Sequence, residues 1–188
     1  MDFLDVALTV AGALDRAGVA YFVGGSMASS FQGEPRATND IDLVIDLQLG
    51  QVEPFAEALG ADFEIDRQAL EEAVRRRGSW NIFFLPLFTK IDLFILGGSP
   101  FDRSEFERRA PWRVRGERTL FIKSPEDSVL RKLLWYRSGG ESSERQWRDV
   151  LLEILRVTGA DLDHAYLDGW ARPLAVMDLL ERARLTAR

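Results

Sequence analysis

The stretch VAYFVGGSMASSFQ, residues 19–32, and the segment DIDLVIDL, residues 40–47, decide the fold. VAYFV is a short apolar and aromatic run, which predicts a strand, and it leads directly into Gly24-Gly25-Ser26, after which residues 27–32 look helical. In DIDLVIDL the apolar residues alternate with acids, so we expect a strand whose outer face carries Asp40, Asp42 and Asp46. The order is therefore strand, tight turn, helix, strand.

The pattern of apolar and polar residues before and after these two segments predicts the remaining helices and strands. Helical spacing covers residues 3–17, 51–59, 67–77 and 102–109, two strands flank Pro86 within residues 79–96, and residues 112–123 read as a hairpin. From Ser124, a capping residue followed by Pro125, every further segment is helical, over residues 125–137, 146–157, 162–171 and 173–185. We expect an α/β (α+β) core over residues 1–123, with a small mixed sheet flanked by helices. A C-terminal helical region, residues 124–188, would pack on that core.

Composition narrows the class of protein. The chain of 188 residues suits one domain with a helical appendage, and no apolar run approaches the roughly 20 residues that span a bilayer. Asp2 and Asp5 stand where a secretory signal carries positive charge, and the sequence has no cysteine. These features predict a cytoplasmic protein that is not associated with a membrane.

The single histidine, His164, excludes a metal site built from several histidines. A Ser-His-Asp hydrolase would depend entirely on this ring, and the sequence lacks the Gly-x-Ser-x-Gly motif of many such enzymes. Charge is uneven, since residues 1–102 hold 16 acidic and 7 basic residues, whereas residues 103–148 hold 12 basic and 7 acidic ones. Such a distribution is able to place cations opposite a carboxylate cluster, but this count alone favours random surface charge.

Asp40 and Asp42 have the spacing of a metal-binding pair. Two residues apart on one strand face, their backbone positions are about 6.7 Å apart, so their carboxylates are able to converge. That arrangement suits two divalent cations about 3.5–4 Å apart, as used in phosphoryl and nucleotidyl transfer. Mg²⁺ is the natural ion because it prefers carboxylate and phosphate oxygens, and Mn²⁺ is an alternative. The plain interpretation is a solvated polar strand face.

Gly24-Gly25-Ser26 adds a second signal at the strand-to-helix junction. Backbone N–H groups and the helix dipole form an anion site there, and glycine lets a phosphate approach closely. Alone, the triplet is typical of an ordinary turn. Followed by Asp-x-Asp on the next strand, it supplies a polyphosphate cradle and metal ligands within one short β-α-β stretch.

On these residues the sequence resembles the nucleotidyltransferase superfamily. The signature of that superfamily is a Gly-Gly/Ser turn, then Asp-x-Asp on the next strand and a third carboxylate further on, here Asp92. The run Arg36-Ala37-Thr38-Asn39-Asp40 looks like the bacterial minimal nucleotidyltransferases and the AbiEii-type branch related to toxin–antitoxin systems. The helix SPEDSVLRKLLWYR (124–137) and the segment RQWRDVLLEIL (145–155) also resemble that branch, so the likeness covers roughly residues 18–155.

The resemblance implies roles for particular residues. Asp40, Asp42 and Asp92 would hold two metal ions, and Asp92 would also accept the proton of the acceptor hydroxyl. Gly24, Gly25, Ser26 and Lys132 would bind the nucleoside triphosphate, with Arg36, Thr38 and Asp149 as further motif positions. The structural alternatives are an edge-strand acid for Asp92, a solvent-facing helix lysine for Lys132 and a first-turn acid for Asp149.

The function implied is transfer of a nucleoside monophosphate from a nucleoside triphosphate to an acceptor, with release of pyrophosphate. The acceptor is a tRNA, a protein or a small molecule such as an aminoglycoside, and the toxin-like branch favours RNA or protein and an antitoxin partner. The alternative is a catalytically inactive nucleotide-binding or toxin–antitoxin interaction module. Intact Asp40, Asp42 and Asp92 argue against it, since degenerate modules commonly lose such acids.

Overall fold

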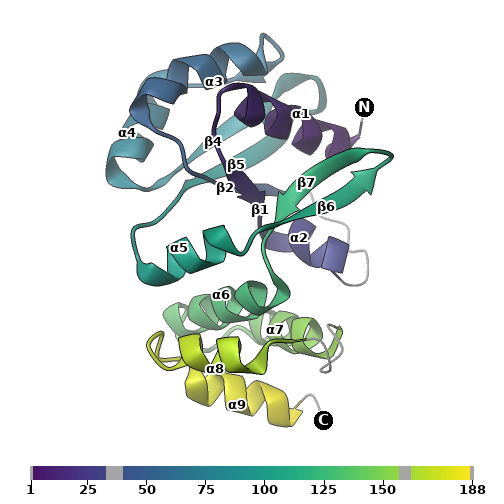
Figure 1. Cartoon of the computed structure of the whole chain (residues 1–188), viewed down its shortest axis with the longest axis vertical. Helices are drawn as coiled ribbons and strands as arrows, with labels where there is room; N and C mark the ends of the chain where they lie inside the picture. Colours follow the sequence, from purple (N-terminus) through teal and green to yellow (C-terminus); the bar gives the residue numbers. More distant parts are fainter. Residues whose placement is uncertain (1, 33–39, 157–161, 187–188) are drawn as a thin grey trace. The chain divides into compact units, whose positions relative to one another are not determined.

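The computed structural model describes residues 2–32, 40–156 and 162–186, and these form two compact units. The first unit, the core, comprises residues 2–28 and 40–123. The second, the helical unit, comprises residues 29–32, 124–156 and 162–186, and the chain passes from one to the other after Lys123 (Figure 1). No helix within the described ranges is long and apolar enough to cross a membrane.

The core is built on a mixed sheet. Within the described residues, its seven strands lie in the order β3-β4-β5-β2-β1-β7-β6. Their bounds are Tyr21–Val23 for β1, Ile41–Ile45 for β2, Phe63–Glu64 for β3, Ser79–Phe84 for β4, Thr89–Ile95 for β5, Ala110–Arg115 for β6 and Arg118–Ile122 for β7. The pairs β2–β5 and β1–β7 are parallel, and the other neighbours are antiparallel. The expected fold class, a mixed sheet flanked by helices, is confirmed.

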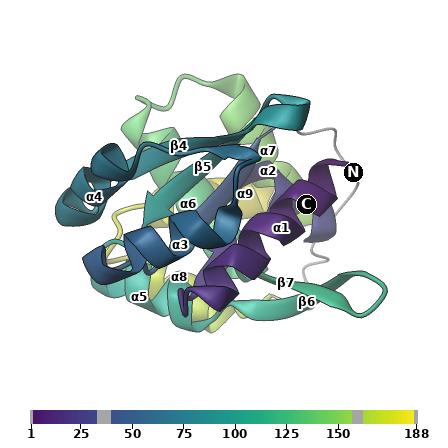
Figure 2. The same ribbon diagram turned by 90° about the horizontal axis from the view of Figure 1, so that it is seen from above.

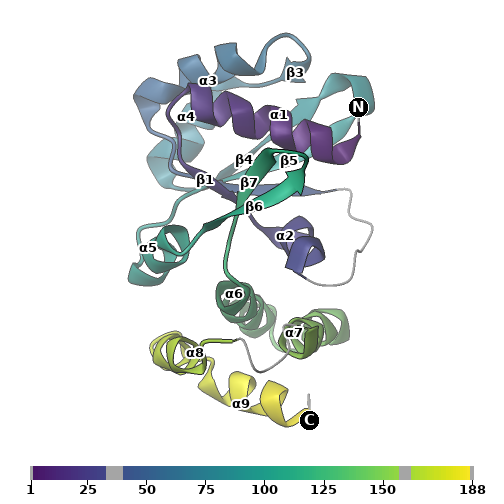
Figure 3. The same ribbon diagram turned by 45° about the vertical axis from the view of Figure 1, so that its right-hand side comes forward.

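One face of the sheet forms the hydrophobic core. Alternate residues of β2 and β5 are buried, namely Ile41, Leu43, Ile45, Ile91, Leu93 and Ile95. They face α1 (Phe3–Arg16), α3 (Val52–Leu59) and α4 (Arg67–Arg76), which cover this side of the sheet (Figures 2 and 3). Because strand side chains alternate, Asp42 and Asp92 necessarily point to the opposite face.

That opposite face is only partly covered. The helix α5 (Pro100–Glu107) and the beginning of α2 (Gly25–Gln32) lie on it (Figure 3). Phe106 of α5 packs on Phe22 of β1, with ring centroids 5.8 Å apart, and Phe22 is the neighbour of Val44 on β2. Apolar packing therefore covers the end of β2 that bears Val44, and the end that bears Asp42 stays polar.

The helical unit contains α6 (Pro125–Ser138), α7 (Glu144–Arg156), α8 (His164–Ala171) and α9 (Met177–Thr186). Two acids at the start of α6 hold α8 in place. Asp127 accepts a hydrogen bond of 2.6 Å from the Tyr166 hydroxyl, and Glu126 accepts one of 3.0 Å from the backbone N–H of Asp163. Both acids are buried, so this motif has a structural role inside the unit in addition to favouring the start of α6.

Several predicted boundaries were wrong. The strand β3 was missed because two residues carry no readable pattern. The helix α2 begins at Gly25 rather than at residue 27, and α5 begins at Pro100 rather than at residue 102. The last helix begins at Met177 instead of residue 173, because Ala175 adopts a left-handed backbone with φ of 55°.

Candidate active site

Asp42 and Asp92 lie side by side on neighbouring strands. They are direct partners in the parallel pairing of β2 with β5, so both side chains project from the same face. The side chain of Asp92 is only 16% exposed, and Asp42 is half-buried. Since β5 lies between β4 and β2, the alternative of an edge-strand acid at residue 92 is wrong.

The turn between β1 and α2 sits directly against the carboxylate of Asp42. The backbone N–H of Gly24 donates a 2.8 Å hydrogen bond to the backbone carbonyl of Asp42. Gly25 has φ of +53°, and a Cβ there would come within 2.7 Å of Cγ of Asp42. Glycine is therefore required at residue 25 both for its backbone conformation and for the space that the carboxylate occupies. Ser26 follows, half-buried, in the first turn of α2.

Acidic side chains concentrate negative charge beside the turn between β1 and α2. Burial raises the pKa of Asp42, and repulsion from Asp92 and then from Asp40 raises it further. Asp40 is exposed and immediately precedes β2. The three acids predicted as a group are thus close enough to influence one another, and the site favours a positive charge beside them.

Two lysines provide part of the positive charge beside these acids. Neither of them was predicted from the sequence as a site residue. Lys90 Nζ lies 2.8 Å from Oδ2 of Asp92, and this hydrogen bond is the main cause that raises the pKa of Lys90. Lys123 follows β7, is buried to 4% exposure, and lies 3.9 Å from the equally buried Glu105. Both lysines act to lower the pKa of Asp42, although less strongly than burial and the acids raise it.

The surface around Asp92 is aromatic. In the antiparallel pairing of β4 with β5, Asn81 is the partner of Asp92, and Phe83 is the partner of Lys90. Phe94 lies two residues beyond Asp92 on the same face, and Phe83 and Phe94 are 40% and 39% exposed. Asp92 is therefore flanked by two exposed phenyl rings. The sequence predicted the two apolar strands but not that these rings lie beside Asp92.

The donor atoms present suit a hard divalent cation. Carboxylates that repel one another are stabilised by a bound metal ion, and oxygen ligands are those that Mg²⁺ prefers. Within the described ranges, no three acidic or histidine side chains stand together at ligating distances. Asp42 and Asp92, as direct strand neighbours, are the residues best placed to hold an ion, with Asp40 two residues away.

Of the other predicted residues, two lie on helices of the helical unit. Lys132 lies on α6 and Asp149 on α7, both half-buried and both in the helical unit. Arg36 and Thr38 lie outside the described residues. The core thus brings together Gly24, Gly25, Ser26 and the three acids.

Known structures resemble the whole chain. No protein-family model matches it, and no curated protein matches it by sequence. A solution structure of the antibiotic-resistance factor ANT(2'')-Ia superposes with a TM-score of 0.54 at 17% identity, covering 100% of this chain and 96% of that one. An antigenic nucleotidyltransferase-like protein from Paracoccidioides brasiliensis superposes with a TM-score of 0.54 at 19% identity, covering 98% and 94%. A crystal structure of ANT(2'')-Ia with adenylyl-2''-tobramycin gives a TM-score of 0.52 at 15% identity, covering 97% and 99%.

These likenesses define the class of fold. The chain has the nucleotidyltransferase fold, with the helical unit included in the match, as the turn and the acids of the sequence predicted. Because the sequence identities are below 20%, these likenesses support the fold alone. The chemistry must be inferred from the residues of the site.

Proposed function

We propose that the protein transfers a nucleoside monophosphate from a nucleoside triphosphate to a hydroxyl group of an acceptor and releases pyrophosphate. The observation that carries this proposal is the contact of the Gly24-Gly25 turn with Asp42, which has Asp92 as its direct neighbour. A phosphate held by the turn would lie next to the carboxylates, which is the arrangement that nucleotidyl transfer needs.

Each residue of the site has a distinct task in this reaction. The backbone N–H groups of Gly25 and Ser26, at the start of α2, bind phosphate oxygens. Asp40, Asp42 and Asp92 would hold Mg²⁺, as two ions, or Mn²⁺ in its place. When bound, the metal neutralises charge on the transferring phosphate and on the departing pyrophosphate.

The bond changes are those of an in-line displacement. The acceptor oxygen forms a bond to the α-phosphorus while the bond between that phosphorus and pyrophosphate breaks. Asp92, whose Oδ2 lies 2.8 Å from Lys90 Nζ, would take the proton of the acceptor hydroxyl. From the helical unit, Lys132 would bind the triphosphate and Asp149 would support the site, together with Arg36 and Thr38.

Experiment must decide whether the acceptor is a tRNA, a protein or a small molecule. Likeness over the full chain to ANT(2'')-Ia, whose structure was determined with adenylyl-2''-tobramycin, supports a small polyhydroxylated acceptor. The rings of Phe83 and Phe94 beside Asp92 give such a molecule a flat apolar surface. The resemblance to the AbiEii-type branch supports RNA or protein instead, and with it an antitoxin partner.

A second candidate is the inactive nucleotide-binding or interaction module. The observation that favours it is the ion pair between Lys90 and Asp92, since a lysine at 2.8 Å occupies an oxygen that a metal would need. In that case the nucleoside triphosphate would bind at the turn, and no nucleoside monophosphate would be transferred from it.

Thermal unfolding with and without ligands tests nucleotide binding. Mg²⁺ and a triphosphate together should raise the melting temperature more than the sum of their separate effects, because the residues that would hold the metal lie beside the turn that would hold the phosphates. Ser26→Ala should reduce this joint effect and leave the melting temperature without ligand unchanged. If none of the four ribonucleoside triphosphates shows a joint effect, the transfer proposal fails, and stabilisation by a triphosphate without Mg²⁺ would favour the inactive module. A joint effect without transfer to tRNA, protein extract or aminoglycosides would favour the inactive module.

A further inference from the structure

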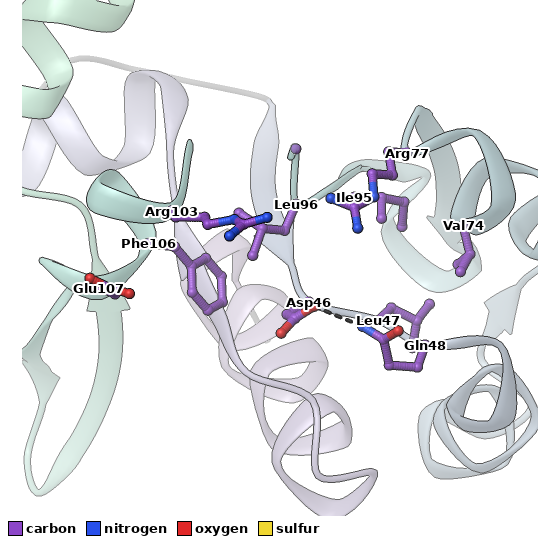
Figure 4. A pocket seen from close by; sticks show the side chains of 11 residues that line it. Asp46, Leu47, Gln48, Val74, Arg77, Ile95, Leu96, Arg103, Phe106 and Glu107 are labelled. Atoms are coloured by element: carbon purple, nitrogen blue, oxygen red, sulfur yellow. Dashed lines mark hydrogen bonds between the residues drawn. The ribbon is translucent and has the colours of Figure 1, made fainter. Parts of the chain in front are cut away.

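A cavity of about 350 Å³ lies at the end of β2 and β5 that is remote from Asp42 and Asp92 (Figure 4). Asp46, at its edge, is four residues beyond Asp42, which corresponds to about 13 Å along a strand. Phe106 of α5 lines this cavity and packs on Phe22, so apolar side chains stand between it and the acids. The cavity is therefore distinct from the candidate active site, and both lie within the core unit.

Two arginines of this cavity lack acidic partners. Arg77, after α4, and Arg103, on α5, reach toward the middle of the cavity from opposite sides (Figure 4). Neither side chain has a hydrogen bond or ion pair with any part of the chain that the structure describes. The arginines just before Arg77 differ in this respect, since Arg75 pairs with Glu71 and Arg76 pairs with Glu72.

The two acids that line the cavity form no ion pair with either arginine in the part of the chain that the structure describes. Asp46 instead accepts a 2.8 Å hydrogen bond from the side-chain amide of Gln48. The lining therefore carries two acids and two arginines, and the guanidinium donors of Arg77 and Arg103 are available to a bound anion.

The backbone of Arg77 is left-handed, as it also is at Phe88, Glu141 and Ala175. Arg77 ends α4 in the left-handed conformation, with φ of 50° and ψ of 43°, where glycine or asparagine is favoured. A side chain in this conformation costs about 1 kcal/mol. Its guanidinium also lies against Gly98, where a Cβ would come within 2.8 Å of Nη1. Strain of this kind tends to be retained where a residue has a function.

The apolar part of the lining comes from Leu47, Val74, Ile95, Leu96 and Phe106. We propose that the cavity binds a small organic anion, in which a carboxylate or phosphate head pairs with Arg77 and Arg103 while a short apolar group packs on these side chains. Arginine suits such a head because its planar guanidinium donates two parallel hydrogen bonds to an oxyanion. The cavity volume lies at the lower end of the range for small-molecule sites, so a ring-sized group fits. The site is independent of nucleotide transfer.

Calorimetric titration of the full chain at constant ionic strength tests this inference. The probes are phenyl phosphate, benzoate and, as the uncharged counterpart, benzyl alcohol. We expect saturable binding of phenyl phosphate, of benzoate or of both, and which of them binds identifies the anionic head. Arg77→Gln and Arg103→Gln should each weaken binding about tenfold, and Arg76→Gln, a neighbour outside the cavity, should leave it unchanged. Benzyl alcohol should bind at least tenfold more weakly.

Arg77→Gly separates loss of the ligand from loss of the fold. This change relieves the left-handed backbone, so the melting temperature should stay equal or rise while anion binding falls. The inference is overturned if neither anion binds saturably, if benzyl alcohol binds as well as the anions, or if binding survives the substitutions at both Arg77 and Arg103. Survival of phenyl phosphate binding in those variants would place the anion at the Gly25 turn instead.

Discussion

Asp42 and Asp92 are partners across the parallel strands β2 and β5, and the carboxylate of Asp42 touches the Gly25 backbone. This relationship joins three segments that are far apart in the sequence. The turn contributes backbone N–H groups, β2 contributes one acid, and β5 contributes another.

Gly25→Ala should damage the site more than the fold. The added Cβ would approach Cγ of Asp42 to 2.7 Å, and the positive φ of 53° would cost an alanine about 1 kcal/mol. Nucleotide-dependent stabilisation should be lost. Gly116→Ala is the matched control, because Gly116 has φ of 59° and open space around its Cα. It should lower the melting temperature by a similar amount and preserve nucleotide binding, and a Gly25→Ala variant that also preserves it would contradict the account.

Asp42→Asn should stabilise the protein free of metal at neutral pH. Burial and the neighbouring acids raise the pKa of Asp42, so the folded state binds its proton more tightly than the unfolded chain does. The charged form therefore weakens folding above the raised pKa, and the penalty disappears as pH falls below the ordinary value of 3.8. Urea unfolding with EDTA at several pH values measures this. A variant less stable than wild type at pH 7 would show that Asp42 is favourably paired.

Lys90→Gln should make Asp92 more available to a metal. Lys90 is 40% exposed, so losing its ion pair should change the free energy of unfolding by less than about 1 kcal/mol. The joint stabilisation by Mg²⁺ and a triphosphate should increase, because the lysine competes for an oxygen of Asp92. Arg113→Gln, which removes an exposed ion pair with Glu117, serves as the control. A smaller joint stabilisation in Lys90→Gln would indicate that Lys90 assists binding rather than competing.

The sequence predicted this part of the core well because the local pattern and the fold agree there. The strict alternation of DIDLVI places Asp42 on the outer face, and the Gly-Gly turn has a backbone that needs glycine. The pairing of Asp42 with Asp92 depends on a strand register across about fifty residues, which no local pattern encodes. The resemblance implied only that Asp92 belongs to the metal site, and the structure shows Asp42 and Asp92 as direct strand partners.

Other residues of the site could not be predicted from the sequence, because strand pairing brings them together and no local pattern encodes that pairing. Lys123 reads as a polar residue ending an apolar run, and only the pairing of Val23 with Ile122 brings it close to the Gly24 turn. Asn81 and Phe94 join the site through the antiparallel pairing of β4 with β5. The packing of residues 124–188 on the core, the roles of Lys132 and Asp149, and the metal ions stay predictions.

Tyr166→Phe should destabilise the helical unit. The hydroxyl donates a 2.6 Å hydrogen bond to Asp127, whose side chain is fully buried, and a hydrogen bond to a charged group contributes about 1.5–3 kcal/mol. Thr186→Ala removes an exposed hydroxyl from the same unit and should cost less than about 0.5 kcal/mol. Chemical denaturation followed by tryptophan fluorescence measures both changes. Equal stability of the two variants would mean that Asp127 does not hold α8.

The central claim is that Asp42 and Asp92 form the catalytic centre, and transfer of labelled nucleotide tests it most directly. Wild-type protein with Mg²⁺ and α-labelled triphosphates would be incubated with a tRNA pool, a protein extract and a panel of aminoglycosides. We expect label in one acceptor class, and a loss of at least about 100-fold in both Asp42→Asn and Asp92→Asn, since each removes a metal ligand. Asp62→Asn, an exposed acid of the core away from these strands, should transfer normally. Transfer that persists in both Asp42→Asn and Asp92→Asn would contradict the assignment.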